Sequence, residues 1–227
     1  MFVDSDKGNN SNSCASRQLP CKDIRAGFKK VVNAGTLYIK GTHFLTSAIE
    51  VTKSITITSD KEDEGVIKGN GLITFAFTIM GKFPRGSIRV KLSNMHFDTI
   101  GMMSYEMIRT SSSEMECDGC APKKASIIEI ENITTLNTWR LPKCTGIGRP
   151  CSLWISGNPS SFDLTISYSK FKNTSSIVMH GSKDVHILNC SFHNHHFTSA
   201  LQDTRYTCLL LSGMDFDNDR KYHVQWL

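Results

Sequence analysis

ILNCSFHN at residues 187–194 and ISYSKFKN at residues 166–173 share one sparse pattern. Each segment begins with isoleucine, has phenylalanine five residues later, and ends in asparagine two residues after that. An aliphatic residue also stands two places before each isoleucine, at Val185 and Leu164. This alternation of apolar and other residues has a period of two, which is typical of β-strands.

The same pattern occurs seven times along the chain, although the copy at Ile57 matches only by half and the copy at Ile130 has Thr135 in place of the phenylalanine. The gaps between copies range from 18 residues (39 to 57) to 38 residues (92 to 130), as expected for one repeating unit that carries loops of different length. Each copy is therefore predicted to form one β-coil that buries its apolar side against its neighbours. The predicted inward column is Ile39, Ile57, Leu92, Ile130, Ile166, Ile187 and Leu211, with Phe44, Phe97, Phe171, Phe192 and Phe216 in a second column.

The fold class predicted from this pattern is an all-β solenoid with a short N-terminal capping helix. Only residues 22–33 show helical periodicity, with Ile24, Phe28, Val31 and Val32 on one face. We divide the chain into a cap, residues 1–34, which contains the Cys14/Cys21 loop and the helix, and a stack of coils, residues 35–227, that is left open at the C-terminus.

Charge and hydropathy exclude several classes of protein. The net charge of +5 comes from 26 basic and 21 acidic residues without a long basic run, so nucleic acid is not an expected partner. No apolar run approaches the ~20 residues that span a bilayer. The amino end, MFVDSDKGNN, lacks the basic start and the apolar stretch of a signal peptide.

The cysteines are even in number, which favours disulfides in an oxidising compartment. They are Cys14, Cys21, Cys117, Cys120, Cys144, Cys151, Cys190 and Cys208. The spans Cys14–Cys21 and Cys144–Cys151 each have six intervening residues and are predicted to close surface loops. Cys117–Cys120 would be a strained bridge, and Cys190–Cys208 would join adjacent coils. The alternative is a zinc site built from Cys117 and Cys120 with Cys144 and Cys151, although the second spacing is long for zinc.

Three stretches resemble the right-handed parallel β-helix proteins of the pectin-lyase-like class. They are VHILNCSFHN (185–194), SITITSDKEDEGVIKGNG (54–71) and, most specifically, VDSDKGNNSNSCASRQLPCKDIRAGFKKVVNAGTLYIKGTHF (3–44). The resemblance implies a right-handed single-stranded parallel β-helix over almost the whole chain. It also implies export, with a signal peptide upstream, so we expect the chain to be a fragment of a longer protein. That longer protein could carry a membrane anchor. The fold hosts both enzymes and non-catalytic surface modules.

No catalytic residue, metal site or cofactor is predicted. The hydrolase signatures implied by the resemblance, paired aspartates and Gly-His-Gly, are absent, and only His180-Gly181 remains. Glu129 and Asp163 are the carboxylates that could share an outer face, but the sequence pattern places no basic partner beside them. The runs Asp215-x-Asp217-x-Asp219 and His193, His195, His196 are candidate calcium and transition-metal sites, but polar turns are the favoured interpretation.

Four Asn-x-Ser/Thr sequons would become glycosylation candidates after export: Asn9, Asn132, Asn173 and Asn189. In similar β-helices the repeat position of Asn94, Asn132 and Asn189 holds an inward ladder of stacked amides. A buried amide cannot carry a glycan, so Asn9 and Asn173 are the predicted acceptors.

The expected function is that of a non-catalytic extracellular β-helix module which presents a face for carbohydrate or protein binding. Trp139 and Trp154, beside the Cys144/Cys151 loop, are the candidate binding aromatics. The alternative is a polysaccharide lyase or glycoside hydrolase of the pectin-lyase-like class, and a purely structural spacer is a third hypothesis. Three converging carboxylates with an arginine would favour the enzyme, and a flat face of exposed aromatics would favour binding.

Overall fold

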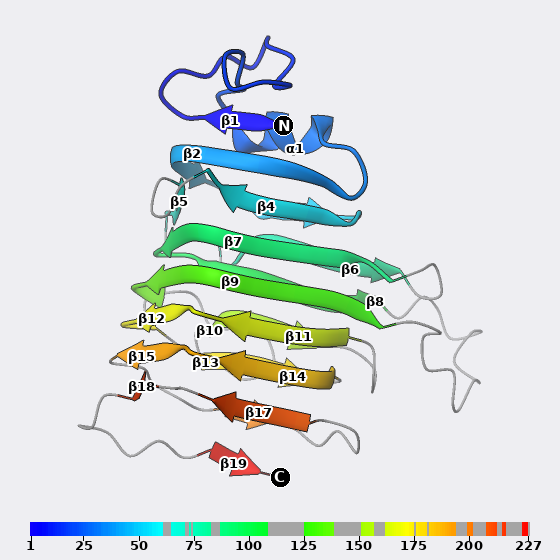
Figure 1. Ribbon diagram of the computed structural model, residues 1–227, viewed down its shortest axis with the longest axis vertical. Helices are drawn as coiled ribbons and strands as arrows, with labels where there is room; N and C mark the ends of the chain where they lie inside the picture. Colours follow the sequence, from blue (N-terminus) through cyan, green and yellow to red (C-terminus); the bar gives the residue numbers. More distant parts are fainter. Residues whose placement is uncertain are drawn as a thin grey trace.

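The computed structural model describes most of the chain up to residue 193 and short segments beyond it (Figure 1). The described residues are 1–60, 65–70, 73, 75–82, 87–108, 125–138, 151–156, 162–174, 176–180, 182–193, 199–201, 208–212, 215–216 and 224–226. The architecture below refers to these segments.

Parallel strands stacked one above another make up almost all of the described chain, which confirms the all-β class. The front sheet contains β1 (Phe2–Asp4), β2 (Gly35–Leu45), β4 (Ile55–Ser59), β7 (Arg89–Asp98), β9 (Ser126–Leu136), β11 (Phe162–Ser167), β14 (Ser182–Leu188) and β17 (Cys208–Ser212). Beyond a bend, the front sheet continues into a second set of strands, which we call the side ladder. The side ladder contains the second halves of β2, β7 and β9 together with β5 (Gly65–Gly69), β12 (Lys170–Lys172), β15 (Ser191–His193) and β18 (Asp215–Phe216).

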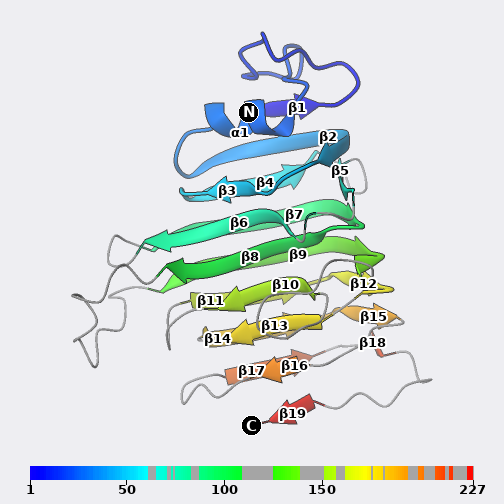
Figure 2. The same cartoon turned by 180° about the vertical axis from the view of Figure 1, so that it is seen from behind.

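A back sheet faces the front sheet across the core (Figure 2). It contains β3 (Ile49–Val51), β6 (Phe75–Lys82), β8 (Gly101–Ile108), β10 (Cys151–Ser156) and β13 (Ser176–His180), while β16 (Ser199–Leu201) pairs with β19 (Val224–Trp226). In chain order each turn visits the front sheet, the side ladder and the back sheet. It then returns to the front sheet beside the strand that it left, and every registered pair is parallel.

Left-handed residues bend the chain from the front sheet into the side ladder. Asn94 and Asn132 interrupt β7 and β9 with φ angles of 55° and 50°. In the next two turns, Tyr168 lies between β11 and β12 and Asn189 between β14 and β15, each with a φ of 51°. Asparagine visits this conformation more readily than most L-residues because its short polar side chain can hydrogen-bond locally. The repeated asparagine of the sequence pattern is therefore a bend signal.

The predicted column is confirmed in register over six of its seven members, and the described side chains among these six are buried. Ile57, Leu92, Ile130, Ile166, Ile187 and Leu211 are consecutive partners in register. The first member is wrong, because Leu37 and not Ile39 pairs with Ile57, while Ile39 pairs with Ser59. Both Leu37 and Ile39 are buried, since residues two apart lie on one face of a strand.

Phe44 is the second correction. It is 73% exposed, and His43 takes the inward place level with Ile67 and Phe97. The reason lies in the bend, because Phe97 follows the left-handed Asn94 by three residues whereas His43 follows the left-handed Gly41 by two. One residue fewer after the bend turns the other side of the strand inward.

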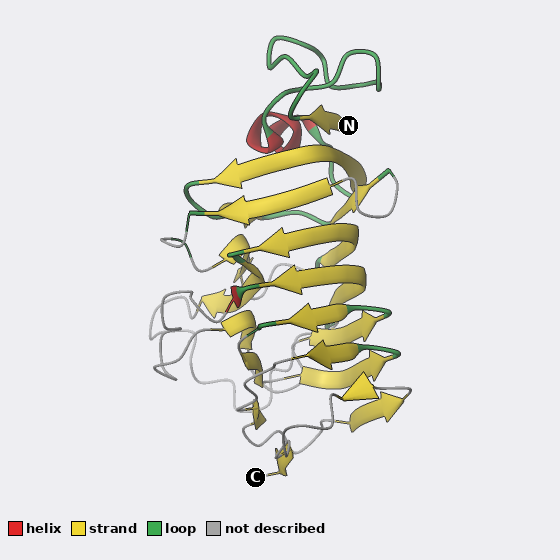
Figure 3. Ribbon diagram, turned by 90° about the vertical axis from the view of Figure 1, so that its left-hand side faces the viewer, coloured by secondary structure: helices red, strands yellow, loops and turns green. Residues whose placement is uncertain are grey.

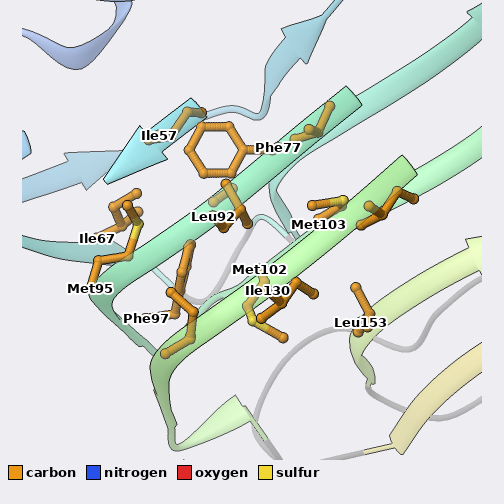
Figure 4. Close-up of a cluster of buried hydrophobic side chains, with 14 of the residues drawn as sticks. Ile57, Ile67, Phe77, Leu92, Met95, Phe97, Met102, Met103, Ile130 and Leu153 are labelled. Atoms are coloured by element: carbon orange, nitrogen blue, oxygen red, sulfur yellow. The ribbon is translucent and has the colours of Figure 1, made fainter. Parts of the chain in front are cut away.

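The buried apolar side chains form one continuous core between the sheets (Figure 4). Phe77 from the back sheet meets Phe97 from the side ladder edge-on, with ring centroids 6.3 Å apart. Phe171 and Phe192, from neighbouring turns, stack at 4.8 Å with an interplanar angle of 7°. Stacking equivalent side chains of successive turns is what buries them, because a single coil has no second layer to cover its apolar face.

The helix α1 (Ile24–Lys30) lies at the N-terminal end of the stack (Figure 3). The Asp23 carboxylate caps it by accepting hydrogen bonds from the backbone N–H groups of Arg25 and Ala26. The helix is shorter than the predicted 22–33, because Val31 is already extended. Val31 is buried, but Val32 is 69% exposed and does not belong to the apolar face.

The Cys14–Cys21 disulfide is confirmed. Cys117, Cys120 and Cys144 lie outside the described residues, as does the side chain of Cys151. The predicted Cys190–Cys208 bridge is wrong, because Cys190 is a free, buried thiol. Cys208 lies level with Asp184 near the start of β14, whereas Cys190 follows the end of that strand. Most of a strand length therefore separates positions that a disulfide needs within about 7 Å.

Stability should depend on pH through His43. Burial is the largest influence on this imidazole and lowers its pKa below the ordinary 6.5, although its Nε2–H donates to the Lys40 carbonyl at 3.0 Å. Because the unfolded chain then binds the proton more readily, stability present in full above pH 6.5 is lost as the pH falls through the folded pKa. His43→Leu should flatten the unfolding free energy measured between about pH 8 and about pH 5. An unchanged slope in the variant would contradict this assignment.

Candidate functional site

Charged side chains on the outer surface of the front sheet are paired across neighbouring turns. Arg89 on β7 reaches diagonally to Glu129 on β9, with its Nε and Nη2 each donating to a carboxylate oxygen at 2.8 Å. These hydrogen bonds raise the pKa of Arg89. Lys91 makes the same diagonal ion pair with Glu131. Glu129 therefore does have a basic partner, contrary to the expectation from the sequence.

Glu129 and Asp163, the two carboxylates that could share an outer face, lie on the same outer surface but are not level. Glu129 pairs in register with Thr165, and Asp163 pairs with Ile127 on one side and Asp184 on the other. Asp163 Oδ1 is buried and has no hydrogen-bond partner among the described residues. The side-by-side acids are thus Asp163 and Asp184, and Glu129 is occupied by Arg89. In the described part of the chain no group of three or more potential metal ligands comes together.

The bend from the front sheet into the side ladder, which we call the first bend, carries a short ladder of asparagine amides. Asn132 Nδ2 donates to Asn94 Oδ1 at 3.0 Å, and Asn94 Nδ2 approaches Thr58 Oγ1 at 3.4 Å. Both asparagines are half-buried, so the predicted ladder exists between these two turns. It does not extend to Asn189, which is exposed, because Tyr168 occupies the intervening place. The prediction that Asn189 is buried is therefore wrong.

A second polar column follows the side ladder. Asn137 Nδ2 donates to Asp98 Oδ1 at 3.1 Å, and Asn173 Nδ2 approaches Asn137 Oδ1 at 3.5 Å. Partial burial would by itself raise the pKa of Asp98. Hydrogen bonds from Asn137, Thr99 and Lys68 outweigh burial and lower that pKa, so Asp98 is a carboxylate at neutral pH. Its ion pair with Lys68 spans 3.3 Å.

The outer surface of the side ladder carries side chains of different chemical kinds at successive turns. One register row runs through Phe44, Lys68, Asp98, Leu136, Lys172 and His193. We call these six residues the mixed column. Phe44 and Lys172 are exposed and the others are partly exposed. The strands that carry it lie along the left edge in Figure 1.

The remaining predicted site residues are placed as follows. Trp139, His195, His196, Asp217 and Asp219 lie outside the described residues, as do the side chains of Trp154 and Asp215; their backbones belong to β10 and β18. His193 ends β15, where its carbonyl accepts from the Asn173 N–H at 3.0 Å. The predicted glycan acceptors Asn9 and Asn173 are both exposed.

Sequence reasoning missed the accessible aromatic residues Phe44 and Tyr168. Phe44 matches the repeat at plus five, which predicts a core position. Tyr168 occupies a place that asparagine fills in the neighbouring copies. The mismatch at Tyr168 is visible in the sequence. A large aromatic residue at a bend position indicates an exposed side chain, since a bend lies at the surface.

No protein-family model, curated protein or solved structure matches this chain. The family resemblance carried by the amino-terminal segment and the repeat therefore stays a proposal. The structure itself establishes parallel strands in register from turn to turn and one disulfide among the described residues. It also contains no described helix that is long and apolar enough to cross a membrane.

The amide ladder provides a test of the bend. Asn132→Ala should lower the free energy of unfolding by about 1–3 kcal/mol, because alanine loses the hydrogen bond to Asn94 and tolerates a φ of 50° less well. Asn132→Gly separates the two contributions, since glycine accepts the left-handed conformation without strain. Chemical denaturation of the parent chain, Asn132→Ala and Asn132→Gly measures the three free energies of unfolding. Equal stability of the alanine and glycine variants would show that the bend is not strained.

Proposed function

We propose that this chain is a right-handed single-stranded parallel β-helix of the pectin-lyase-like kind and acts as a non-catalytic binding module. The support for the fold is the recurring path from front sheet to side ladder to back sheet, with each turn one strand further along the stack. Right-handed crossovers are the strongly preferred hand for parallel strands. The helix and the Cys14–Cys21 loop at the first turn fit the proposed N-terminal cap.

An extracellular or cell-surface location is part of the proposal. The Cys14–Cys21 disulfide is typical of oxidising compartments. Asn9 and Asn173 are exposed acceptors in sequons, so the proposed module is a glycoprotein. Oxidised thiols and accessible sequons are separate features, and both fit the secretory route.

The observation that carries the binding function is the mixed column. The inward column that builds the core repeats one type of residue, because stacked turns present the same environment at each level. The mixed column instead varies between aromatic, cationic, anionic and aliphatic side chains at a spacing of ~4.8 Å. Such variety on an accessible surface supports recognition of a carbohydrate or protein ligand that lies along several turns. Both signs of charge in it argue against nucleic acid.

Binding should depend on the two most accessible members of the mixed column. The chain would be screened against neutral and acidic polysaccharides and a panel of extracellular proteins. Phe44→Ala and Lys172→Ala should each weaken any captured ligand about tenfold or more, which is the usual size of a loss at a binding hot spot. Val32→Ala is the matched control, because Val32 is similarly exposed but lies just after α1. Equal loss in all three variants, or none in any, would contradict a binding face here.

The alternative enzyme rests on one observation: Asp163 and Asp184 are adjacent, and the buried Oδ1 of Asp163 has no hydrogen-bond partner among the described residues. Glycoside hydrolases use two carboxyl groups that flank the scissile bond. Here Glu129 is paired with Arg89 and is not free to join them. We expect no turnover of pectate, polygalacturonate or alginate, with or without calcium, measured by unsaturated products and reducing ends. Activity that Asp163→Asn abolishes would replace the binding module with the enzyme.

A further inference from the structure

Asn189 is the most accessible of the asparagines at the first bend. It belongs to the sequon Asn189-Cys190-Ser191 and has an exposed side chain at a φ of 51°. The following Cys190 is buried, so the bend anchors the backbone while the amide faces outward. No hydrogen bond to the Asn189 carboxamide is formed by the described residues around it. Its nitrogen is thus available for a reaction that other amides of the column cannot undergo.

Asn132 shows why the bend alone is not enough. It too belongs to a sequon, but its Nδ2 donates to Asn94 Oδ1 at 3.0 Å between two stacked turns. A sugar on that nitrogen would have to fit between amides that lie one strand spacing, ~4.8 Å, apart. This limit does not apply to Asn189, because its neighbour in the preceding turn is Tyr168, whose side chain has no amide to stack on that of Asn189. The two sequons occupy equivalent repeat positions and differ in this neighbour.

We propose that Asn189 carries an N-linked glycan whose first sugar ring packs against the exposed phenol ring of Tyr168. This inference rests on the export included in the proposed function. Tyr168 is 58% exposed and lies beside Asn189, since its N–H donates to the Leu188 carbonyl at 3.0 Å. An aromatic ring offers an apolar face to the C–H groups of a sugar and a hydroxyl to the water around it. The contact gives a reason for an exposed tyrosine in an asparagine column.

The modification is an ordinary glycosyl transfer in the secretory pathway. Asn189 Nδ2 forms a bond to the anomeric carbon of an oligosaccharide carried on a lipid diphosphate. The bond from that carbon to the diphosphate oxygen breaks, the lipid diphosphate leaves with the electron pair, and the amide nitrogen loses one proton. The acceptor requirement of this chemistry is the sequon itself, with a hydroxyl at Ser191 and no proline between.

Site occupancy is the first test. The chain, secreted from a eukaryotic host behind an added signal peptide, would be digested and its four sequons assayed by mass spectrometry after enzymatic release of glycans in heavy-oxygen water. We expect glycan at Asn189 and none at Asn132. Glycan at Asn9 and Asn173 but not at Asn189 would overturn this inference and leave the proposed glycoprotein with its two acceptors intact. Empty sequons throughout would overturn both, and an occupied Asn132 would refute the ladder argument.

The second test isolates the contact between Tyr168 and the sugar. Ser191→Ala removes the glycan without changing Asn189, and Tyr168→Asn removes the ring while retaining a residue suited to a left-handed φ. The glycan should raise the folding equilibrium constant about three- to tenfold when Tyr168 is present, the range found for aromatic contacts, and have little effect in the Tyr168→Asn background. Tyr168→Phe should behave as the parent. Equal glycan effects in all backgrounds would refute the stacking.

Discussion

Phe171→Ala is expected to lower the free energy of unfolding by about 3–5 kcal/mol, the cost of truncating a buried phenylalanine. The Phe171 side chain is fully buried and stacks on Phe192 of the next turn with ring centroids 4.8 Å apart. Its removal opens a cavity between two turns, and Thr135 on the other side is too small to fill it. The loss should appear as a lower midpoint in urea or guanidinium unfolding.

Phe44→Ala is the matched control for this experiment. Both phenylalanines belong to the side ladder, but Phe44 is 73% exposed. Its truncation removes no core contact, so stability should change by about 0.5 kcal/mol or less. If the two variants were equally destabilised, the inward and outward sides of this ladder would be wrongly assigned.

Removing the Cys14–Cys21 disulfide is expected to cost about 2.5 kcal/mol, the loop-closure entropy for a loop of about eight residues. The loop also holds β1 in place, since the Phe2 N–H donates to the Cys14 carbonyl at 2.8 Å and the Asp4 N–H to the Cys21 carbonyl at 2.9 Å. The double variant Cys14→Ser/Cys21→Ser should therefore unfold at lower denaturant, and β1 amides should exchange faster with solvent.

The single variant Cys190→Ala controls for loss of a thiol without loss of a cross-link, because Cys190 is free and buried. Reduction should lower the midpoint of the parent chain by at least as much as the double variant does, and that of Cys190→Ala by the same amount as in the parent. A parent chain whose unfolding midpoint does not respond to reductant would contradict a stabilising role for this bridge.

The repeat pattern predicted the stacking well because burial enforces it. Ile57, Leu92, Ile130 and Ile166 have to face inward at each turn, and a slip of one residue would expose the whole set. The errors lie where the bend, and not the strand, sets the register. His43 follows the left-handed Gly41 by two residues, whereas Phe97, which lies level with it, follows the left-handed Asn94 by three, so that His43 and not Phe44 points inward. Such a difference depends on local backbone geometry that apolar spacing does not encode.

The candidate surfaces were less predictable because they arise from partners on different turns. The Arg89–Glu129 pair joins residues 40 positions apart in the sequence. The exposure of Asn189 depends on Tyr168 in the preceding turn. The sequence gives the type of each residue, but its contacts depend on the residue beside it in the next turn. That neighbour is known only once the register between the turns is known.

The short strand β1 has a consequence for self-association. An open sheet edge normally invites a strand from another molecule. On β1, however, the outward N–H groups of Phe2 and Asp4 are already bound to the disulfide loop, and the Phe2 carbonyl accepts from the Cys21 N–H at 3.0 Å. The cross-linked loop thus occupies the hydrogen-bonding sites that a foreign strand would need, and it protects this end of the sheet from edge-to-edge aggregation.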